Sequence, residues 1–211
     1  MSKRKKNNIY PLIFVFILTF TTASLLMGVQ AWLSPRIKTN KKMEKLRSIL
    51  TISGIDTDKI NNSELEKIFN KTFSKTELKP GFWRYQRNSQ NKTIAYIYPL
   101  QGKGLWGPVK GFLSTGPKKW KIKDLIITYQ EETPGLGAEI ATSSFYQKFR
   151  GKKITPKPDS SKIVLQVKKE GQTRNKNEVD GITGATQTSK RFNQLLTNSL
   201  KMIVEDRKEL K

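Results

Sequence analysis

The longest apolar pattern in the chain lies near its amino terminus. Residues 9–33 contain no charged side chain, and about 20 helical residues suffice to cross a hydrocarbon core. The run predicts a transmembrane helix, with Tyr10 and Trp32 near the two membrane interfaces. A cleaved signal peptide is the alternative, because Val29-Gln30-Ala31 has the small-residue spacing of a cleavage site. The apolar run is, however, longer than the ~7 to 15 residues of a signal segment.

Basic residues on the two sides of this run bear on its orientation. Residues 1–8 include four consecutive basic side chains at positions 3–6, and the positive-inside bias places such a short end in the cytoplasm. Arg36 and Lys38 on the far side weaken the asymmetry. We predict a single-pass protein whose remaining chain lies outside the cytoplasm.

Helical spacing continues through residues 34–80, which we predict to be a helical lead-in. One helix is expected to begin at Asn40 as its cap and to end at Gly54, with apolar positions Met43, Leu46, Ile49 and Leu50. A second, short helix is expected over residues 63–69, with Ser63 as its cap.

From Phe82 onward the spacing changes to that of strands. Runs rich in β-branched and aromatic residues predict strands over 93–100, 107–114, 125–130 and 162–169. Helical spacing returns at 143–149 and after residue 189. This order predicts an α+β fold with one domain over residues 81–211, in which helices flank a mixed or antiparallel sheet.

The composition limits the chemistry. The chain has no cysteine and no histidine, which removes the usual zinc, copper and iron–sulfur ligands and every Ser-His or Cys-His nucleophile. We therefore expect no metal site and no catalytic side chain, and we expect any chemistry to be carried by a cofactor.

The formal net charge of +23 raises the question of nucleic-acid binding. The basic residues are scattered along the chain rather than interleaved with stacking aromatic residues. We predict no nucleic-acid partner. A solvated surface, anionic lipid or an acidic protein partner accounts better for the charge.

Two glycine-rich segments are candidate binding loops. Residues 131–140 contain Thr133-Pro134-Gly135, which favours a turn, and Gly137, which lets another group approach the backbone. An ordinary turn is the alternative, and the segment is neither a Walker loop nor a dinucleotide fingerprint. In residues 102–112, Leu105 and Trp106 form a candidate wall for a flat ring, although core packing explains Trp106 equally well.

A third segment, residues 179–192, precedes the last helix. Its hydroxyl side chains lie where the first turn of a helix favours a cap or an anion such as phosphate. Gly184 and Ala185 leave room for a bulky group beside the backbone. Both interpretations, a helix cap and a phosphate seat, are open on these grounds. The hydroxyls concerned are those of Thr183, Thr186, Thr188 and Ser189.

The stretch Asp-Gly-Ile-Thr-Gly-Ala-Thr, residues 180–186, resembles the flavinylation motif of the FMN-binding domain family. Residues 132–137, Glu-Thr-Pro-Gly-Leu-Gly, resemble the second signature of that family. The resemblance implies FMN bound covalently through a phosphoester to Thr186, and an exported flavin transferase that recognises Asp180 and Gly181. It implies that Thr183, Gly184, Ala185 and Thr188 shape the phosphate seat. The isoalloxazine would be flanked by Leu105, Trp106, Glu132, Thr133, Pro134, Gly135, Leu136 and Gly137.

Within the family, the Gly-Leu-Trp segment around Trp106 resembles the C subunit of sodium-translocating NADH:quinone reductases more than the G subunit of Rnf-type ferredoxin:NAD reductases. Relatives often have a histidine before the Glu132 turn, where this chain has Tyr129-Gln130-Glu131. The resemblance implies an electron-transfer subunit in a bacterial inner-membrane complex, with other membrane subunits and the lipid bilayer as partners. The alternatives are the Rnf-type protein and a non-redox, membrane-anchored basic interaction module.

Overall fold

The computed structural model describes residues 9–90, 92–117, 120–155 and 162–210. The predicted basic segment 1–8 lies outside these residues. The chain divides into two compact units, Met1–Glu44 and Lys45–Lys211. Each unit is described by itself.

The first unit consists of the larger part of helix α1 (Ile9–Ile52). Its most apolar window has a mean hydropathy of 2.3 and none of that window is buried, so α1 is long and apolar enough to span a membrane. A separate helix capped by Asn40 was predicted, and this is wrong, because α1 runs unbroken through Pro35 and Asn40. Proline has a helical φ and removes only one backbone donor, so the helix continues. Gly54, with φ +89°, follows its end as predicted.

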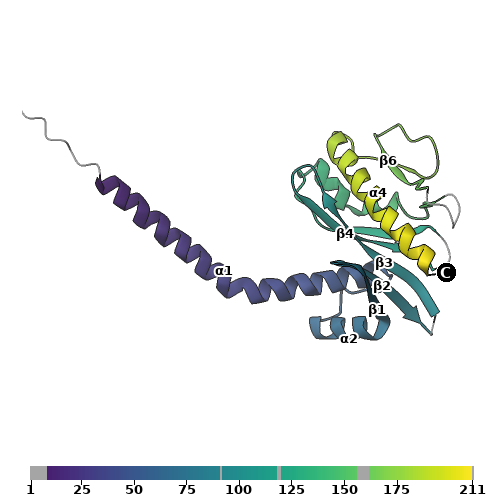
Figure 1. Cartoon of the computed structure of the whole chain (residues 1–211), viewed down its shortest axis with the longest axis horizontal. Helices are drawn as coiled ribbons and strands as arrows, with labels where there is room; N and C mark the ends of the chain where they lie inside the picture. The colour runs from purple at the N-terminus through teal and green to yellow at the C-terminus, as the bar shows by residue number, and fades with distance from the viewer. Residues whose placement is uncertain (1–8, 91, 118–119, 156–161, 211) are drawn as a thin grey trace, which may run out of the picture. The chain divides into compact units, whose positions relative to one another are not determined.

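The second unit is built on a five-stranded antiparallel sheet in sequential order (Figure 1). Its strands are β1 (Phe73–Lys79), β2 (Phe82–Ser89), β3 (Lys92–Lys103), β4 (Pro108–Thr115) and β5 (Ile122–Tyr129). Strand β1 lies within the predicted helical lead-in 34–80, which is therefore not helical throughout. In β1 only Phe73 is buried, so this polar edge strand lacks the alternating pattern that identifies strands.

Helix α2 (Asn62–Thr72) precedes the sheet, and its cap is Asn61 rather than the predicted Ser63. The Asn61 side-chain oxygen accepts the Glu64 backbone N–H at 2.9 Å, and Ser63 donates its hydroxyl to the same oxygen at 2.8 Å. Both residue types cap helices well, so the pattern alone could not choose between neighbours.

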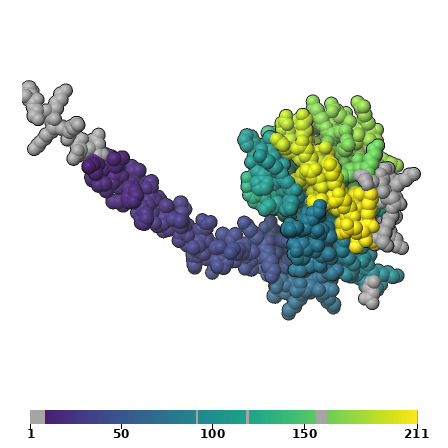
Figure 2. Space-filling model, in the orientation of Figure 1, coloured from purple at the N-terminus to yellow at the C-terminus, as the bar shows by residue number. Residues whose placement is uncertain are grey.

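Helix α4 (Thr186–Glu209) packs on one face of the sheet, and Figure 2 shows it at the surface of the second unit. Tyr98 and Leu100 of β3 join its apolar stripe in one core cluster. At Gly102 a Cβ atom would lie 2.9 Å from the Leu195 side chain, so the helix approaches this strand closely. Tyr85, on β2, contacts Phe69 of α2 and belongs to a different aromatic group.

Shorter elements complete the second unit. They are η1 (Gly137–Ala141), α3 (Ser143–Gln147) and a parallel pair formed by β6 (Gln166–Lys168) and β7 (Glu178–Asp180). The strand predicted over 162–169 is confined to β6, and the pattern did not indicate the three-residue β7. The predicted α+β fold, with a largely antiparallel sheet and flanking helices, is confirmed.

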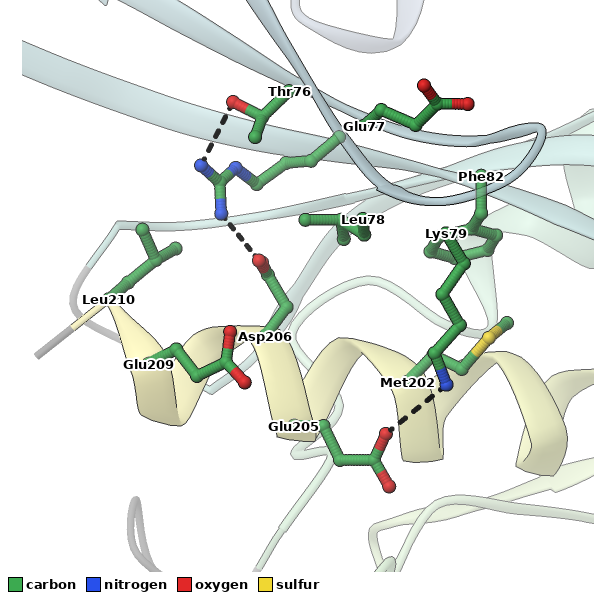
Figure 3. Close-up of a pocket in the computed structure, with 11 residues that line it drawn as sticks. Thr76, Glu77, Leu78, Lys79, Phe82, Met202, Glu205, Asp206, Glu209 and Leu210 are labelled. Atoms are coloured by element: carbon green, nitrogen blue, oxygen red, sulfur yellow. Dashed lines mark hydrogen bonds and ion pairs between the residues drawn. The ribbon is translucent and has the colours of Figure 1, made fainter.

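The carboxyl-terminal end of α4 is fixed by buried charges (Figure 3). Asp206 accepts from the Arg84 guanidinium at 2.5 Å and from the Tyr98 hydroxyl at 2.7 Å. Burial, and then the neighbouring Asp206, raise the pKa of Tyr98 far above its usual range. These three residues tie α4 to β2 and β3 beside a cleft of about 390 Å³. Arg207 covers the Tyr96 ring with a centroid distance of 4.5 Å.

Candidate functional site

The three sequence segments singled out above meet at one buried side chain, Glu132. It follows β5, and its carboxylate contacts the 104–107 turn between β3 and β4 and the first turn of α4. The residue is only 5% exposed. A single carboxylate therefore holds together segments that lie 27 residues before it and 56 residues after it.

The donors to Glu132 are all uncharged. One carboxylate oxygen accepts the backbone N–H groups of Leu105 at 2.7 Å and Trp106 at 3.3 Å. The other oxygen accepts the Thr188 hydroxyl at 2.6 Å. Within the described part of the chain, no ion pair involves Glu132. Hydrogen bonds to an ionised acceptor are strong, so the carboxylate fixes both neighbouring segments.

Two glycines make room for this carboxylate. A Cβ atom at Gly104 would lie 2.3 Å from the nearer Glu132 oxygen, and one at Gly137 would lie 2.6 Å from the Thr188 hydroxyl. Such distances are far below van der Waals contact. Sequence reasoning identified Gly137 as a point of close approach, and the approaching group is the Glu132–Thr188 pair.

The segment that carries the resemblance to the flavinylation motif begins in strand β7 and ends in the first turn of α4. Asp180 closes β7, and the Gly181 N–H donates to the Lys168 carbonyl at 2.8 Å. Gly184 has φ +73°, and a Cβ atom there would lie 3.1 Å from the Leu136 side chain. The motif therefore lies against the turn formed by residues 132–137.

The hydroxyl groups of this segment have separate roles. Thr188 binds Glu132, and the Ser189 hydroxyl accepts the Ile182 backbone N–H at 3.0 Å. The alternative interpretation of these hydroxyls as a side-chain cap is excluded, because Ala185 occupies the cap position and makes no side-chain hydrogen bond. Thr186 is the first residue of α4 and is half-buried, and its hydroxyl has no hydrogen-bond partner among the residues that the structure describes.

Exposed apolar side chains surround this site. Among the described residues of the second unit, five large apolar side chains are exposed. Four of them lie on the segments joined by Glu132 or next to them: Leu105 at 40%, Trp106 at 70%, Tyr129 at 46% and Leu136 at 44%. The core-packing alternative for Trp106 is therefore excluded. Apolar surface of this kind, next to a few fixed polar groups, is typical of a ligand or partner site.

Tyr129 is the last residue of β5. Its hydroxyl donates to Glu131, and this hydrogen bond raises the pKa of Tyr129 above its usual value. Lys110 lies over the Tyr129 ring at 5.8 Å from the centroid. A Cβ atom at Gly107 would collide with Glu131. Gly107 therefore makes room for Glu131, as Gly104 does for Glu132. The contacts of Glu131 with Tyr129 and Gly107 were not predicted from the sequence, although Glu131 directly precedes Glu132.

A cleft of about 270 Å³ lies on the other side of the motif, beside Thr183. Gly181 and Ile182 form part of its wall, and Gly135 and Glu139 form another part. Lys148 of the following turn donates to the Asp180 carbonyl at 3.4 Å. Thr183 is exposed at the edge of this cleft, and its hydroxyl does not share the Glu132 network.

The site is suited to a phosphate-bearing flat ring. The first-turn N–H groups and the positive dipole end of α4 favour an anion at Thr186. Gly184, two residues before Thr186, carries no side chain of its own, and Leu105, Trp106 and Leu136 expose apolar surface on the neighbouring segments.

Comparison with known proteins agrees with this geometry. The sequence model of the FMN-binding domain matches residues 104–201, a range that contains the segments 131–140 and 179–192 and all of 102–112 except its first two residues. A crystal structure of the C subunit of the Na(+)-translocating NADH-quinone reductase from Parabacteroides distasonis is 30% identical, with a TM-score of 0.69 over 83% of this chain and 96% of that chain. These matches place the chain in a class of flavin-binding proteins. The chain belongs to the FMN-binding domain family.

Two curated relatives cover nearly the whole chain. The G subunit of the proton-translocating ferredoxin:NAD(+) oxidoreductase complex of Clostridium ljungdahlii is 28% identical over 97% of this chain and 95% of its own length. The C subunit of the Na(+)-translocating NADH-quinone reductase of Pasteurella multocida is 23% identical over 92% and 90%. With the apolar helix α1, these similarities identify a membrane-anchored member of the family.

Proposed function

We propose that this protein is the electron-transfer subunit of a Na⁺-translocating NADH:quinone oxidoreductase and carries FMN covalently on Thr186. The supporting observation is the state of the Thr186 hydroxyl. It lies at the start of α4, beside exposed apolar side chains, without a hydrogen-bond partner in the described residues, whereas Thr188 and Ser189 are both engaged.

Each part of the site has a task in this proposal. Thr186 anchors the phosphate, and the first-turn N–H groups of α4 stabilise its charge. Leu105, Trp106 and Leu136 supply apolar surface for the ring system. Glu132 holds the Leu105–Trp106 turn and the first turn of α4 in place. Bound FMN supplies the redox chemistry, because a flavin exchanges electrons singly or in pairs.

Attachment is a phosphoryl transfer to an alcohol. In the proposed step, the Thr186 oxygen would form a bond to the flavin-side phosphorus of a flavin dinucleotide, the phosphoanhydride bond would break, the nucleoside monophosphate would leave, and the hydroxyl proton would pass to a base of the transferase. A flavin transferase carries out this step and recognises Asp180 and Gly181. The half-buried Asp180 is held in β7 while Thr183 and Gly184 are exposed, so part of the motif is accessible in the folded protein.

The membrane arrangement follows from α1. The proposal places α1 across the bacterial inner membrane as a single span and the second unit on the periplasmic side, in agreement with the basic residues that precede the span. The partners are the lipid bilayer and the other membrane subunits of the complex. Covalent attachment keeps the flavin on a protein that works outside the cytoplasm.

A second candidate is the FMN-carrying subunit of a ferredoxin:NAD oxidoreductase complex. It is favoured by the 28% identity with the Clostridium relative over nearly the whole chain. The first candidate is favoured by the 30% identity with the crystallised Parabacteroides protein and by the Gly-Leu-Trp turn around Trp106. The two candidates share the covalent flavin and differ in the donor, the acceptor and the coupled ion.

The covalent link is tested by producing the full-length chain together with a flavin transferase and examining it on a denaturing gel. Flavin fluorescence is expected to persist in the wild-type band and to disappear in Thr186→Ala. Thr186→Ser keeps a hydroxyl at the same position and is expected to retain the flavin.

The matched control is Thr173→Ala, which removes an exposed hydroxyl outside the motif and leaves the acceptor intact. Flavin that is released on denaturation, or fluorescence that survives in Thr186→Ala, would contradict the proposal. A folded protein without flavin that still binds its partner with a steep salt dependence would support the non-redox interaction module instead.

The parent complex is tested separately by purification of the intact assembly from its own membranes. Flavin reduction by NADH and Na⁺-dependent quinone reduction are expected for the first candidate. Reduction by ferredoxin, with NAD⁺ as the final acceptor, would establish the second candidate and leave the assignment of Thr186 unchanged.

A further inference from the structure

The membrane-spanning helix is followed directly by a basic segment. Arg36, Lys38, Lys41 and Lys42 occur within ten residues of Leu33, and all four side chains are exposed. Proline at position 35 does not interrupt the helix, so these residues continue the same α1 that carries the apolar run. The basic segment therefore begins where the anchor leaves the hydrocarbon.

Three lysines of this segment share one helical face. Lys38, Lys41 and Lys42 are spaced i, i+3 and i+4, which places side chains on one side of an α-helix. With a rise of about 1.5 Å per residue, they lie roughly 7 to 14 Å beyond Leu33 along the helix axis. This interval is comparable to the Debye length of about 8 to 10 Å at physiological salt.

An aromatic contact marks the start of the same segment. Trp32 is 72% exposed, and the Arg36 guanidinium lies over its ring at 5.8 Å from the centroid. Tryptophan favours the membrane interface, and an arginine one turn further on reaches the head-group level with its charge while its stem covers apolar surface. Trp32 and Arg36 therefore fix how far from the membrane interface Lys38, Lys41 and Lys42 lie.

We propose that Arg36 and the face formed by Lys38, Lys41 and Lys42 bind the head groups of anionic phospholipids. Their ammonium and guanidinium groups donate hydrogen bonds to lipid phosphates, which are acceptors of opposite charge. The occupant is lipid, because the segment adjoins the apolar run of a membrane-anchored helix and carries charge of one sign along this face. Part of the net charge of +23 is thereby assigned to the bilayer surface.

The absence of cysteine makes a direct test possible. A single Thr39→Cys substitution introduces one labelling position, and Thr39 is exposed within the segment. The full-length chain carries a red fluorophore there, outside the flavin emission, in nanodiscs of phosphatidylcholine and phosphatidylglycerol. Quenching is compared for a quencher attached to the head group of either lipid.

We expect the label to sense phosphatidylglycerol about 5-fold more strongly than phosphatidylcholine at low salt, the preference that one well-placed lysine provides. In the triple variant Lys38→Gln, Lys41→Gln, Lys42→Gln the preference is expected to fall clearly below the wild-type value, because Arg36 alone of the four basic residues remains. Salt at about 0.5 M is expected to reduce the wild-type preference in the same direction.

The control variant is Lys121→Gln, Lys176→Gln, Lys201→Gln, which changes net charge equally at exposed positions of the second unit. It is expected to keep the wild-type preference. Equal preferences in the wild type and the first variant would overturn the proposal, as would an equal loss in the control or a preference that salt does not change. A lack of lipid preference in the isolated chain would also contradict it.

The readout does not depend on flavin or on Thr186. Failure of this test would leave the proposed electron-transfer function standing, and failure of flavin attachment would leave the lipid proposal standing.

Discussion

The two ends of helix α4 each border a buried carboxylate, and the two carboxylates are held in different ways. Asp206 at the carboxyl-terminal end is paired with Arg84 and with the Tyr98 hydroxyl. Glu132, beside the amino-terminal end, is held by two backbone N–H groups and the Thr188 hydroxyl. Their exposures are nearly equal, at 6% and 5%.

The surroundings of the two carboxylates differ more than their burial. Beside Asp206, the Arg84 and Arg207 guanidinium groups lie over the Tyr96 ring, and Arg207 also lies over Trp120. The Glu132 network opens onto exposed Leu105, Trp106 and Leu136. The ion pair of Asp206 fixes the carboxyl-terminal end of α4 to the sheet. The neutral donors of Glu132 instead position two segments beside an exposed apolar surface.

The largest effect on stability is expected at the carboxyl-terminal end of α4. Asp206→Ala leaves Arg84 buried without its ion-pair partner, and breaking a buried pair in this way costs about 3 to 5 kcal/mol of unfolding free energy. Urea unfolding of the second unit measures the change. Flavin attachment to the remaining folded protein is expected to persist, because Thr186 lies at the opposite end of α4.

Glu205→Gln is the matched control, since its ion pair with Lys79 is long, at 3.9 Å, and both side chains are exposed. The change is expected to stay below about 0.5 kcal/mol. If Asp206→Ala unfolded no more easily than this control, the two ends of α4 would not differ as described.

The next largest effect is expected from Gly104→Ala. Its methyl group meets the Glu132 carboxylate and the Gly107 carbonyl, so it displaces the turn at a cost of about 1 to 3 kcal/mol. Covalent flavin measured by denaturing-gel fluorescence is expected to fall as well. Gly171→Ala is the control, because open space surrounds it and only its φ of +70° opposes the change. Equal flavin loading in both variants would show that the 104–107 turn is not needed for flavin attachment.

A smaller effect is expected from removing one hydroxyl. Thr188→Val keeps the shape of the side chain but leaves one Glu132 oxygen buried without its donor, a loss of about 1 to 3 kcal/mol. Thr188→Ser restores the donor and is expected to recover both stability and flavin loading. Thermal unfolding and flavin fluorescence are measured together. Failure of the serine variant to recover would show that the methyl group matters more than the hydrogen bond.

The smallest effect concerns alkaline pH and Tyr98. Its pKa is raised by burial and by Asp206, so above about pH 10 the unfolded state loses this proton while the folded state keeps it. Stability contributed by this group is present below about pH 10 and falls as pH rises, by at most about 1.4 kcal/mol at about pH 11. Tyr98→Phe is expected to flatten the pH dependence of urea unfolding between about pH 9.5 and 11. Parallel slopes would contradict the assignment.

The sequence predicted those parts of the fold in which each pattern is local. The apolar run of α1, the stripe of α4 and strands β3, β4 and β5 follow directly from spacing. Strand β1 was not predicted, because it is polar and lies at the edge of the sheet. The boundary at Asn40 was wrong because proline inside a helix and proline before a helix look alike in the pattern.

The candidate site was predictable as three segments but not as one network. Turn chemistry and family resemblance identified the segments around Leu105, Glu132 and Thr186. That Glu132 is buried and binds Thr188, rather than lying open beside a ring, depends on distances between residues far apart in the chain. No local pattern contains those distances.

The span of the Glu132 hydrogen bonds has a consequence for how the protein folds. Contacts between residues far apart in sequence carry a large loop-closure cost and form late. The 104–107 turn depends on the pairing of β3 with β4, and α4 packs only on a formed sheet. We therefore expect the site around Thr186 to be completed late in folding, and an enzyme that requires the assembled site would modify only molecules that have reached that stage.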